Sequence, residues 1–254
     1  MAYASMQELD RALADLNLAC ELDPHDAKSR YDRGLIYVRE GQFKPALQDF
    51  SAAITLQPDD IGPYLSRARL LQSHPDIGPT DATAEIRSDL DTASRLAAPD
   101  AGVRLILSTL YQTLGDYPAA LDQVDQWLSH HPLRDEQETG LNDRCWLRAT
   151  ANRDLHEALE DCNRALGLWM GAQQDSDVLD SRGLVYLRLG NLRDAMEDYN
   201  SVLQIDPKVP TSLYGRGLAE LRLGKKTQGE ADLAAAGKLD KGIAQRFAKM
   251  GLTP

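Results

Sequence analysis

Residues 27–60 read AKSRYDRGLIYVREGQFKPALQDFSAAITLQPDD, and the key residues of this stretch recur along the chain at a fixed spacing. Two segments carry small and aromatic residues at regular intervals, and Gly41 stands between them. This pattern predicts two helices joined by a turn, with Pro58 ending the second helix. The stretch is therefore a repeat unit with which the rest of the chain can be aligned.

This unit resembles the tetratricopeptide repeat (TPR), a helix-turn-helix motif whose length matches the spacing in this chain. The resemblance rests on the small, aromatic, turn and helix-ending positions: Gly34, Tyr37, Gly41, Ala46, Phe50, Ala53 and Pro58. It implies an all-α fold in which helix pairs stack into a solenoid with a right-handed superhelix. Because it covers nearly the whole chain, we predict a single elongated domain over residues 1–254.

Alignment to this unit predicts about six full repeats, a partial repeat at the N-terminus and a capping helix at the C-terminus. The predicted segments are 1–26 (partial), 27–60, 61–100, 101–134, 139–172, 176–209, 210–243 and, for the capping helix, 244–254. Residues 73–80 are predicted to form a loop insertion, because Pro75, Gly78 and Pro79 disfavour a helix. We interpret this insertion as a tolerated surface loop.

The two ends of the chain differ. The first unit lacks most of its first helix, so we expect the sequence to be a fragment or to begin late. At the other end, Ile243, Phe247 and Met250 have helical spacing. They predict a short helix that covers the last unit.

Composition limits the function classes. The chain is 43% hydrophobic and only 6% aromatic, which suits helices packed closely through Ala and Leu. Its formal charge of -11 argues against nucleic-acid binding, which depends on clustered Lys and Arg, and favours basic partner segments. The chain has no membrane-span-length apolar run and no secretory signal, so we expect a soluble chain.

Cysteine usage bears on the compartment. Cys20, Cys145 and Cys162 are too few and too scattered for a disulfide framework or a metal cluster. This favours the cytoplasm, whereas a periplasmic protein would need a signal peptide on a longer parent chain. Cys145 and Cys162 take apolar places on the two helices of one unit. They could bridge under oxidation, but we expect them to pack in the core.

Many charged residues follow the repeat. The arginines that precede the small residue of the first helix are Arg33, Arg67, Arg182 and Arg216. The aspartates at the matching place of the second helix are Asp15, Asp49, Asp89, Asp161, Asp198 and Asp232. One unit has Leu107 in the Arg place and Gln123 in the Asp place. We therefore expect Arg–Asp bridges, either within a unit or between neighbours.

The middle of the array is irregular. Trp127 replaces a small residue, and Trp146 stands where the first helix normally has Gly or Ala. We expect this larger ring to change the local helix crossing.

No constellation of residues indicates catalysis. The segment HEALE at His156 lacks the second His of a zinc-binding HExxH helix. The segment LGKKT around Gly224 lacks the first Gly of a phosphate-binding loop. The other histidines are dispersed. We predict a non-catalytic protein with no cofactor and no metal.

What the resemblance implies for function is a concave groove, lined by the first helices, that binds peptide segments of other proteins. The groove positions predicted in this sequence are Tyr31, Leu35, Arg39, Arg69, Gln72, Thr109, Gln112, Arg144, Asp180, Arg188, Tyr214 and Arg222. This mixture of apolar residues and arginines suits a peptide that carries aliphatic anchors and an acidic group.

TPR co-chaperones that grip a C-terminal carboxylate use a set of Lys and Asn residues on successive first helices. This chain has Lys28 in a suitable place, but Leu35, Ser66 and Arg69 hold the Asn positions. A clamp of that type is therefore not expected.

Three hypotheses for function follow. The first is a protein-protein interaction scaffold. The second is a C-terminal docking or regulatory region of a larger enzyme, because LNDRCWLRATANRDLHEALEDCNRAL and SLYGRGLAELRLG resemble TPR tails of bacterial multidomain proteins. The third is a homodimer formed through the uncovered first unit.

Overall fold

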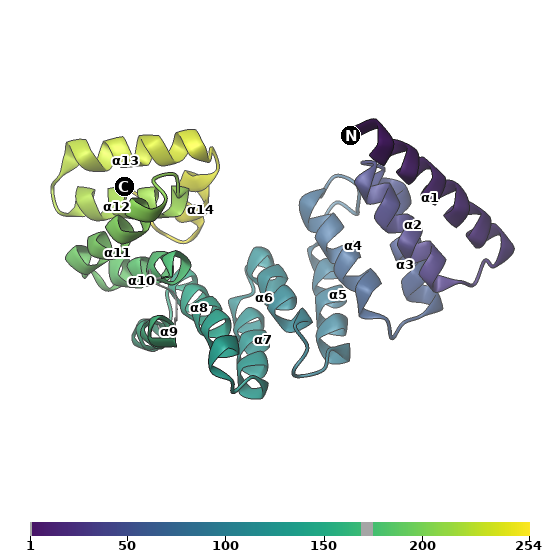
Figure 1. Ribbon diagram of the computed structural model, residues 1–254, viewed down its shortest axis with the longest axis horizontal. Helices are drawn as coiled ribbons and strands as arrows, with labels where there is room; N and C mark the ends of the chain where they lie inside the picture. Colours follow the sequence, from purple (N-terminus) through teal and green to yellow (C-terminus); the bar gives the residue numbers. More distant parts are fainter. Residues whose placement is uncertain (1, 169–174) are drawn as a thin grey trace. The chain divides into compact units, whose positions relative to one another are not determined.

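The computed structural model describes residues 2–168 and 175–254, and every regular element in these two ranges is an α-helix. The chain forms two compact units, Met1–Gln123 and Val124–Pro254 (Figure 1). The boundary falls inside α7 (Tyr117–His130). The predicted all-α class is confirmed, whereas one continuous solenoid and the number of repeats stay predictions.

Unit 1 is built from helix pairs that follow one another along the chain. Its helices are α1 (Ala2–Leu22), α2 (Ala27–Arg39), α3 (Phe43–Leu56), α4 (Ile61–Ser73), α5 (Thr83–Leu96), α6 (Val103–Leu114) and the first part of α7. Helix α2 packs on α3 and α4 packs on α5, while α1 contacts α2 and α3 contacts α4. Asp26 and Asp60 cap α2 and α4 by accepting backbone N–H groups, so the sequence fixes where these helices begin.

Unit 2 repeats the same plan. Its helices after α7 are α8 (Arg134–Ala151), α9 (Leu155–Leu168), α10 (Ser176–Leu189), α11 (Leu192–Ile205), α12 (Pro210–Arg222), α13 (Lys226–Leu239) and α14 (Ile243–Lys249). The pairs α8/α9, α10/α11 and α12/α13 are in contact, and so are α9 with α10 and α11 with α12. Residues 169–172, the end of the predicted 139–172 segment, lie outside the described residues.

The turn inside a helix pair needs a left-handed residue. Gly190 ends α10 with a φ of 78°, a conformation that costs little only for glycine. Asn152 takes the same role after α8 with a φ of 53°. There Asp154 has a positive φ as well, which makes this turn one residue longer.

Glycines also let paired helices approach closely. A Cβ atom on Gly34 would lie 2.7 Å from Cε1 of Phe50, and one on Gly183 would lie 2.8 Å from Cε1 of Tyr199. Both rings are buried, so neither can move aside without opening the core. Each small residue and the ring opposite it thus form the centre of a helix pair.

The Gly183→Ala substitution is expected to lower the free energy of unfolding by about 1–3 kcal/mol, because the added methyl group overpacks the Tyr199 ring. Gly237→Ala in α13 is the matched control, since nothing lies within 4 Å of its added Cβ. Alanine favours a helix over glycine by about 0.5–1 kcal/mol, so this variant should gain stability. Urea unfolding followed by circular dichroism measures both, and equal effects of the same sign would contradict the close approach.

Helix α1 differs from the expectation of two helices in the first unit. It runs without a break from Ala2 to Leu22. Gln7 stands one repeat length before Gly41, the residue that turns the chain between α2 and α3 with a φ of 73°. A side chain at this place disfavours the left-handed conformation, so the helix continues.

Two other boundaries shift. Helix α8 begins at Arg134, so residues 135–138 extend this helix instead of separating two units, as Glu and Gln in this segment favour. The insertion after α4 covers residues 74–82, and α5 begins at Thr83, whose N–H donates to the side chain of Asp81 at 2.9 Å. The predicted loop 73–80 is thus found with slightly different ends.

Helix α14 packs on α12 and α13 at the end of unit 2. Ile243 and Phe247 are buried, and the Phe247 ring lies 4.5 Å from the ring of Tyr214. The third buried residue is Leu252 instead of Met250, because Gly251, with a φ of 77°, turns the chain back after the helix.

Candidate protein-binding site on the first helices

An arginine on the first helix of a pair binds an aspartate on the second. Arg33 donates from Nε and Nη2 to the two carboxylate oxygens of Asp49, both at 2.7 Å. The other predicted pairs that adopt this two-bond geometry are Arg67–Asp89, Arg182–Asp198 and Arg216–Asp232. The predicted Arg–Asp bridges are confirmed.

The same arginines also reach the preceding helix pair. Nη1 of Arg33 donates to the side-chain oxygen of Asn17 on α1 at 3.0 Å. The corresponding bonds join Arg67 to Ser51, Arg182 to Asn163 and Arg216 to Asn200. One side chain thus ties three helices together, so the bridge acts both within a unit and between neighbours.

Where Leu107 and Gln123 replace the usual pair, a different arginine takes over. Arg104 lies one helical turn before Leu107 and donates to the amide oxygen of Gln123 at 2.7 Å. It also donates to the backbone carbonyls of Ala97 and Ala98. A polar connection between α6 and α7 is therefore retained within unit 1 without a carboxylate.

Arg144 corrects the sequence-based assignment. The predicted groove includes it, but it donates to both oxygens of Asp161 at 2.8 and 2.7 Å and to Asp125 at 2.7 Å. The longer turn at Asp154 shifts α8 by one residue relative to α9. Cys145, not Trp146, therefore stands in the place that Gly183 holds in α10.

The two cysteines of this helix pair form a disulfide. Cys145 and Cys162 are bonded with their Cα atoms 5.6 Å apart, whereas the sequence-based expectation is core packing as free thiols. They occupy the positions at which Gly34 faces Phe50 in the α2/α3 pair, and this explains why they meet. Disulfides are typical of oxidising compartments, so the cysteine usage no longer favours the cytoplasm.

The predicted groove residues of unit 2 make internal contacts. Arg188 donates to the carbonyl of Ala149 at 3.1 Å and to that of Met250 at 2.6 Å. Arg222 donates to the carbonyl of Leu187 at 3.1 Å. These guanidinium groups bind the ends of neighbouring segments, and we leave them out of the candidate site.

The two other predicted positions of unit 2 are covered. Asp180 is hydrogen-bonded to the hydroxyl of Ser212, and burial raises the pKa of its carboxyl to about 6. Tyr214 lies under Phe247 of the capping helix. Neither side chain offers an open surface to a partner.

Unit 1 contains an open pocket on the predicted face. It has a volume of about 240 Å³ and is bounded by α2, α3 and α4. The residues that line it are Leu35, Val38, Phe50, Ser66, Arg69, Leu70, Ser73 and His74. Leu35 is 36% exposed. The imidazole ring of His74 stacks on the ring of Phe43, with the two ring centroids 3.6 Å apart. The structure thus brings together Leu35 and Arg69, which the sequence predicts as separate groove positions.

Two arginines, one on α2 and one on α4, have guanidinium groups that no described residue binds. Arg39 and Arg69 are exposed, and within the described residues neither guanidinium makes a hydrogen bond or an ion pair. This sets them apart from the bridging arginines such as Arg33. An apolar pocket beside free cations can accept an aliphatic side chain together with a nearby carboxylate.

The remaining predicted positions of unit 1 are not among the residues that line this pocket. The hydroxyl of Tyr31 bonds that of Ser66 at 3.2 Å, and Gln72 donates to the carbonyl of Leu110 at 3.0 Å. Thr109 is exposed and Gln112 is half-buried on α6. The sequence projection missed Val38, Leu70 and His74. Val38 lies three residues after Leu35, so helical spacing would have indicated it, whereas Leu70 directly follows Arg69 and His74 caps the end of α4, so spacing from Arg69 did not indicate them.

Family models described as "Tetratricopeptide repeat" and "TPR repeat" match residues 1–73 and 183–224. The chain is a tetratricopeptide-repeat protein. A TPR protein from Parabacteroides merdae superposes with a TM-score of 0.68 at 18% identity. The superposition covers 98% of this chain and 95% of the Parabacteroides chain. In the crystal structure of the APC/C hetero-tetramer Cut9-Hcn1, a chain superposes with a TM-score of 0.61 at 16% identity, covering 96% of this TPR chain and 46% of its own. At these identities the likeness shows the fold.

Two relatives are similar in sequence to this TPR protein. Mitochondrial import receptor subunit TOM34 of Rattus norvegicus is 25% identical over 242 residues, which cover 91% of this chain and 73% of that protein. Sperm-associated antigen 1 of Mus musculus is 22% identical over 210 residues, and the matched part covers 82% of this chain but 22% of that protein. The TPR fold is a scaffold for protein interaction. Among the helices of the described residues, none is long and apolar enough to cross a bilayer.

Proposed function

We propose that this TPR protein is a non-catalytic scaffold that binds a peptide segment of a partner through the pocket between α2 and α4. The observation that carries the proposal is the exposed Leu35 beside Arg69, whose guanidinium makes no bond to the described residues. Apart from Arg39, the other arginines on first helices that the structure describes are bound to carboxylates or carbonyls, as Arg33 and Arg222 are. An arginine kept exposed beside an apolar pocket is suited to a partner.

The chemistry of the pocket defines the segment that it would accept. The volume of about 240 Å³ suits one aliphatic side chain, which would replace water against Leu35 and Leu70. A carboxylate near that side chain would pair with Arg69, and Arg39, one helical turn after Leu35, provides a second positive charge on the same side of α2. The bound segment is therefore aliphatic and acidic.

The Arg69→Glu substitution is expected to weaken binding of such peptides by about 10- to 100-fold, because it removes a charge-assisted hydrogen bond and adds repulsion. Peptides would first be selected from a random displayed library on the immobilised full chain. Affinities of synthetic copies would then be measured by isothermal titration calorimetry against the wild type and the variant. Selected peptides should combine an aliphatic residue with Asp or Glu.

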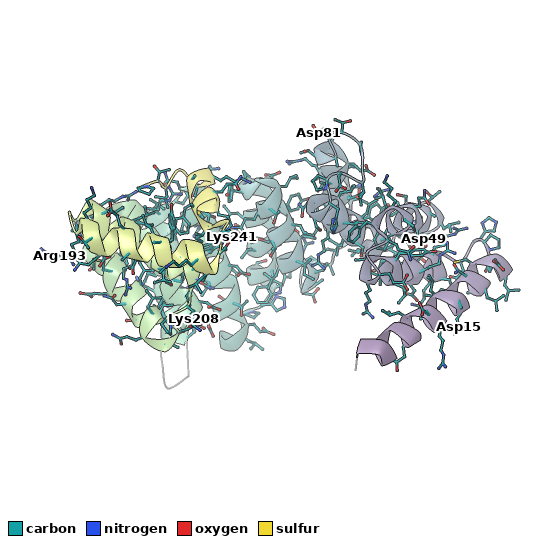
Figure 2. All side chains as sticks on the ribbon, turned by 90° about the horizontal axis from the view of Figure 1, so that it is seen from above. Asp15, Asp49, Asp81, Arg193, Lys208 and Lys241 are labelled. Atoms are coloured by element: carbon teal, nitrogen blue, oxygen red, sulfur yellow. A yellow bond between two sulfur atoms is a disulfide. The ribbon has the colours of Figure 1, made fainter. Side chains whose placement is uncertain are left out.

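The matched control is Arg193→Glu, which makes the same charge change at an exposed arginine on α11. Figure 2 shows Arg193 at the outer edge of its unit. This control should bind the peptides as the wild type does, and both variants should keep native circular dichroism. Equal affinity of the Arg69→Glu variant would remove the pocket as the binding site.

Two further hypotheses stay predictions. One is that the chain serves as the C-terminal docking or regulatory region of a larger enzyme. The other is a homodimer through the first unit. The absence of nucleic-acid binding also stays a prediction, and so does a bacterial origin, which rests on the resemblance of two segments to TPR tails of bacterial proteins.

A further inference from the structure

Helix α1 carries the pattern of a second helix. Ala12, Leu16 and Ala19 stand one repeat length before Ala46, Phe50 and Ala53 of α3. Asn17 accepts a hydrogen bond from Arg33 of the following pair, as Ser51 on α3 accepts one from Arg67. Toward α2, therefore, α1 already does what a second helix does.

The side of α1 that would pack on a first helix has no helix against it in the described residues. In α3, the residues Ala46, Phe50 and Ala53 are fully buried in the pair with α2. Their counterparts on α1 are only half-buried, and Leu18 and Leu22 of α1 are 54% and 78% exposed. Figure 1 shows α1 as the outermost helix of unit 1. We call the surface of Ala12, Asp15, Leu16, Ala19 and Leu22 the α1 face.

The α1 face contains an aspartate, Asp15, that has no arginine partner among the described residues. Its counterpart Asp49 is 4% exposed and is bound by Arg33. The aspartates at this place that receive an arginine on both oxygens in the later pairs are Asp89, Asp161, Asp198 and Asp232. Asp15 is exposed and has no arginine bound to it anywhere in the ranges 2–168 and 175–254. In Figure 2, Asp49 lies among the packed helices and Asp15 on the outermost one.

We propose that the α1 face binds an α-helix of a partner protein that presents an arginine followed directly by a small residue. The arginine would pair with Asp15, and the small residue would lie against Leu16. The helix pair α4/α5 uses the same combination, with Arg67 and Ala68 on one helix and Asp89 and Leu90 on the other. Charge complementarity with a carboxylate that is otherwise always paired selects this partner over a purely apolar one.

The test uses a fluorescein-labelled synthetic peptide with the sequence of residues 60–74, DIGPYLSRARLLQSH, which carries Arg67 and Ala68. Fluorescence anisotropy would follow its binding to the full chain. Saturable binding is expected, and it should weaken about tenfold or more with Asp15→Asn in the protein or with Arg67→Gln in the peptide. Asp15 is exposed, so its substitution should leave the fold intact.

A charge reversal separates a direct pair from a general charge effect. The Asp15→Arg protein should bind the Arg67→Asp peptide more tightly than it binds the unchanged peptide. Exchange of the peptide with the chain's own α4 would depend on Asp89 instead of Asp15. Equal binding to the wild type and the Asp15→Asn variant would thus overturn the proposal, and so would the absence of saturable binding.

Two measurements keep this proposal separate from the pocket and from self-association. The Arg69→Glu variant should bind the peptide as the wild type does, because Arg69 lies on α4 and not on α1. Light scattering of the chain alone should give a mass near 28.1 kDa. A doubled mass that the Asp15→Asn variant abolishes would overturn the proposal, because a second copy would then cover the face.

Discussion

The Arg67→Ala substitution is expected to lower the free energy of unfolding of unit 1 by about 3–5 kcal/mol. Asp89 is 2% exposed, and Arg67 donates to its two oxygens at 2.8 and 2.6 Å. Removing the guanidinium leaves a buried carboxylate without its counter-charge, which costs more than the pair itself contributes. The bond from Arg67 to Ser51 on the preceding pair is lost as well.

The pH dependence of this loss gives an independent check. Burial raises the pKa of Asp89, and Arg67 opposes that rise. Without Arg67 the pKa of Asp89 in the folded state should rise further above its unfolded value. The folded variant then binds a proton more readily than the folded wild type, so its deficit relative to the wild type should shrink as the pH falls.

Urea unfolding by circular dichroism would measure the loss, and hydrogen exchange would locate it in α4 and α5. The Arg67→Lys variant keeps the charge but cannot form the two-bond geometry, so an intermediate loss is expected. Arg95→Ala is the control, because Arg95 is exposed on α5 and donates to the hydroxyl of Thr92 within the same helix at 3.0 Å, so its loss should change the stability by no more than about 0.5 kcal/mol. A loss for Arg67→Ala no larger than that of the control would contradict the role of the bridge.

The repeat spacing was sufficient to predict these bridges. Because Arg33, Arg67, Arg182 and Arg216 each precede a small residue, their common environment could be inferred before their partners were seen. The alignment failed at α8, where a turn with two left-handed residues adds one position. Aligning Asp143-Arg144-Cys145 with Asp32-Arg33-Gly34 gives the correct register, in which Cys145 holds the small position. Alignment with a fixed period places Trp146 at that position instead.

The binding face was predictable only in part. Helical spacing indicated that Leu35 and Arg69 face the same way, and the pocket contains both. It could not indicate that Arg188 binds the carbonyl of Met250, which lies 62 residues further along the chain. Every residue has a backbone carbonyl, so the sequence does not indicate which one accepts a hydrogen bond from an arginine. Exposure had to come from the structure.

Loss of the Cys145–Cys162 disulfide is expected to lower the free energy of unfolding of unit 2 by about 3 kcal/mol. The bond closes a loop between residues 17 apart in sequence, and it joins α8 directly to α9. Reduction by dithiothreitol converts it to two thiols, which leave the unfolded chain less restricted. Tryptophan fluorescence during urea unfolding would measure the change, because Trp127 and Trp146 lie in this unit and unit 1 contains no tryptophan.

Controls separate the bond from other effects of the reductant. The Cys145→Ala, Cys162→Ala double variant should be no more stable than the reduced wild type, because it also loses two buried sulfur atoms, and it should not respond to dithiothreitol. Cys20→Ala removes the free cysteine of unit 1 and should keep the full response. A wild-type transition that stays unchanged after thiol titration has shown three free thiols would contradict the prediction.

Replacing the disulfide by the glycine–phenylalanine contact of the α2/α3 pair tests why unit 2 has a disulfide at this position. In the α2/α3 pair, the places of Cys145 and Cys162 are held by Gly34 and Phe50, whose close contact fills the centre of the pair. The Cys145→Gly, Cys162→Phe double variant should therefore recover much of the lost stability and should be insensitive to reduction. The double alanine variant leaves a cavity at the same place and should not recover it. Recovery by glycine and phenylalanine, but not by two alanines, would mean that the disulfide substitutes for a small residue packed against a ring.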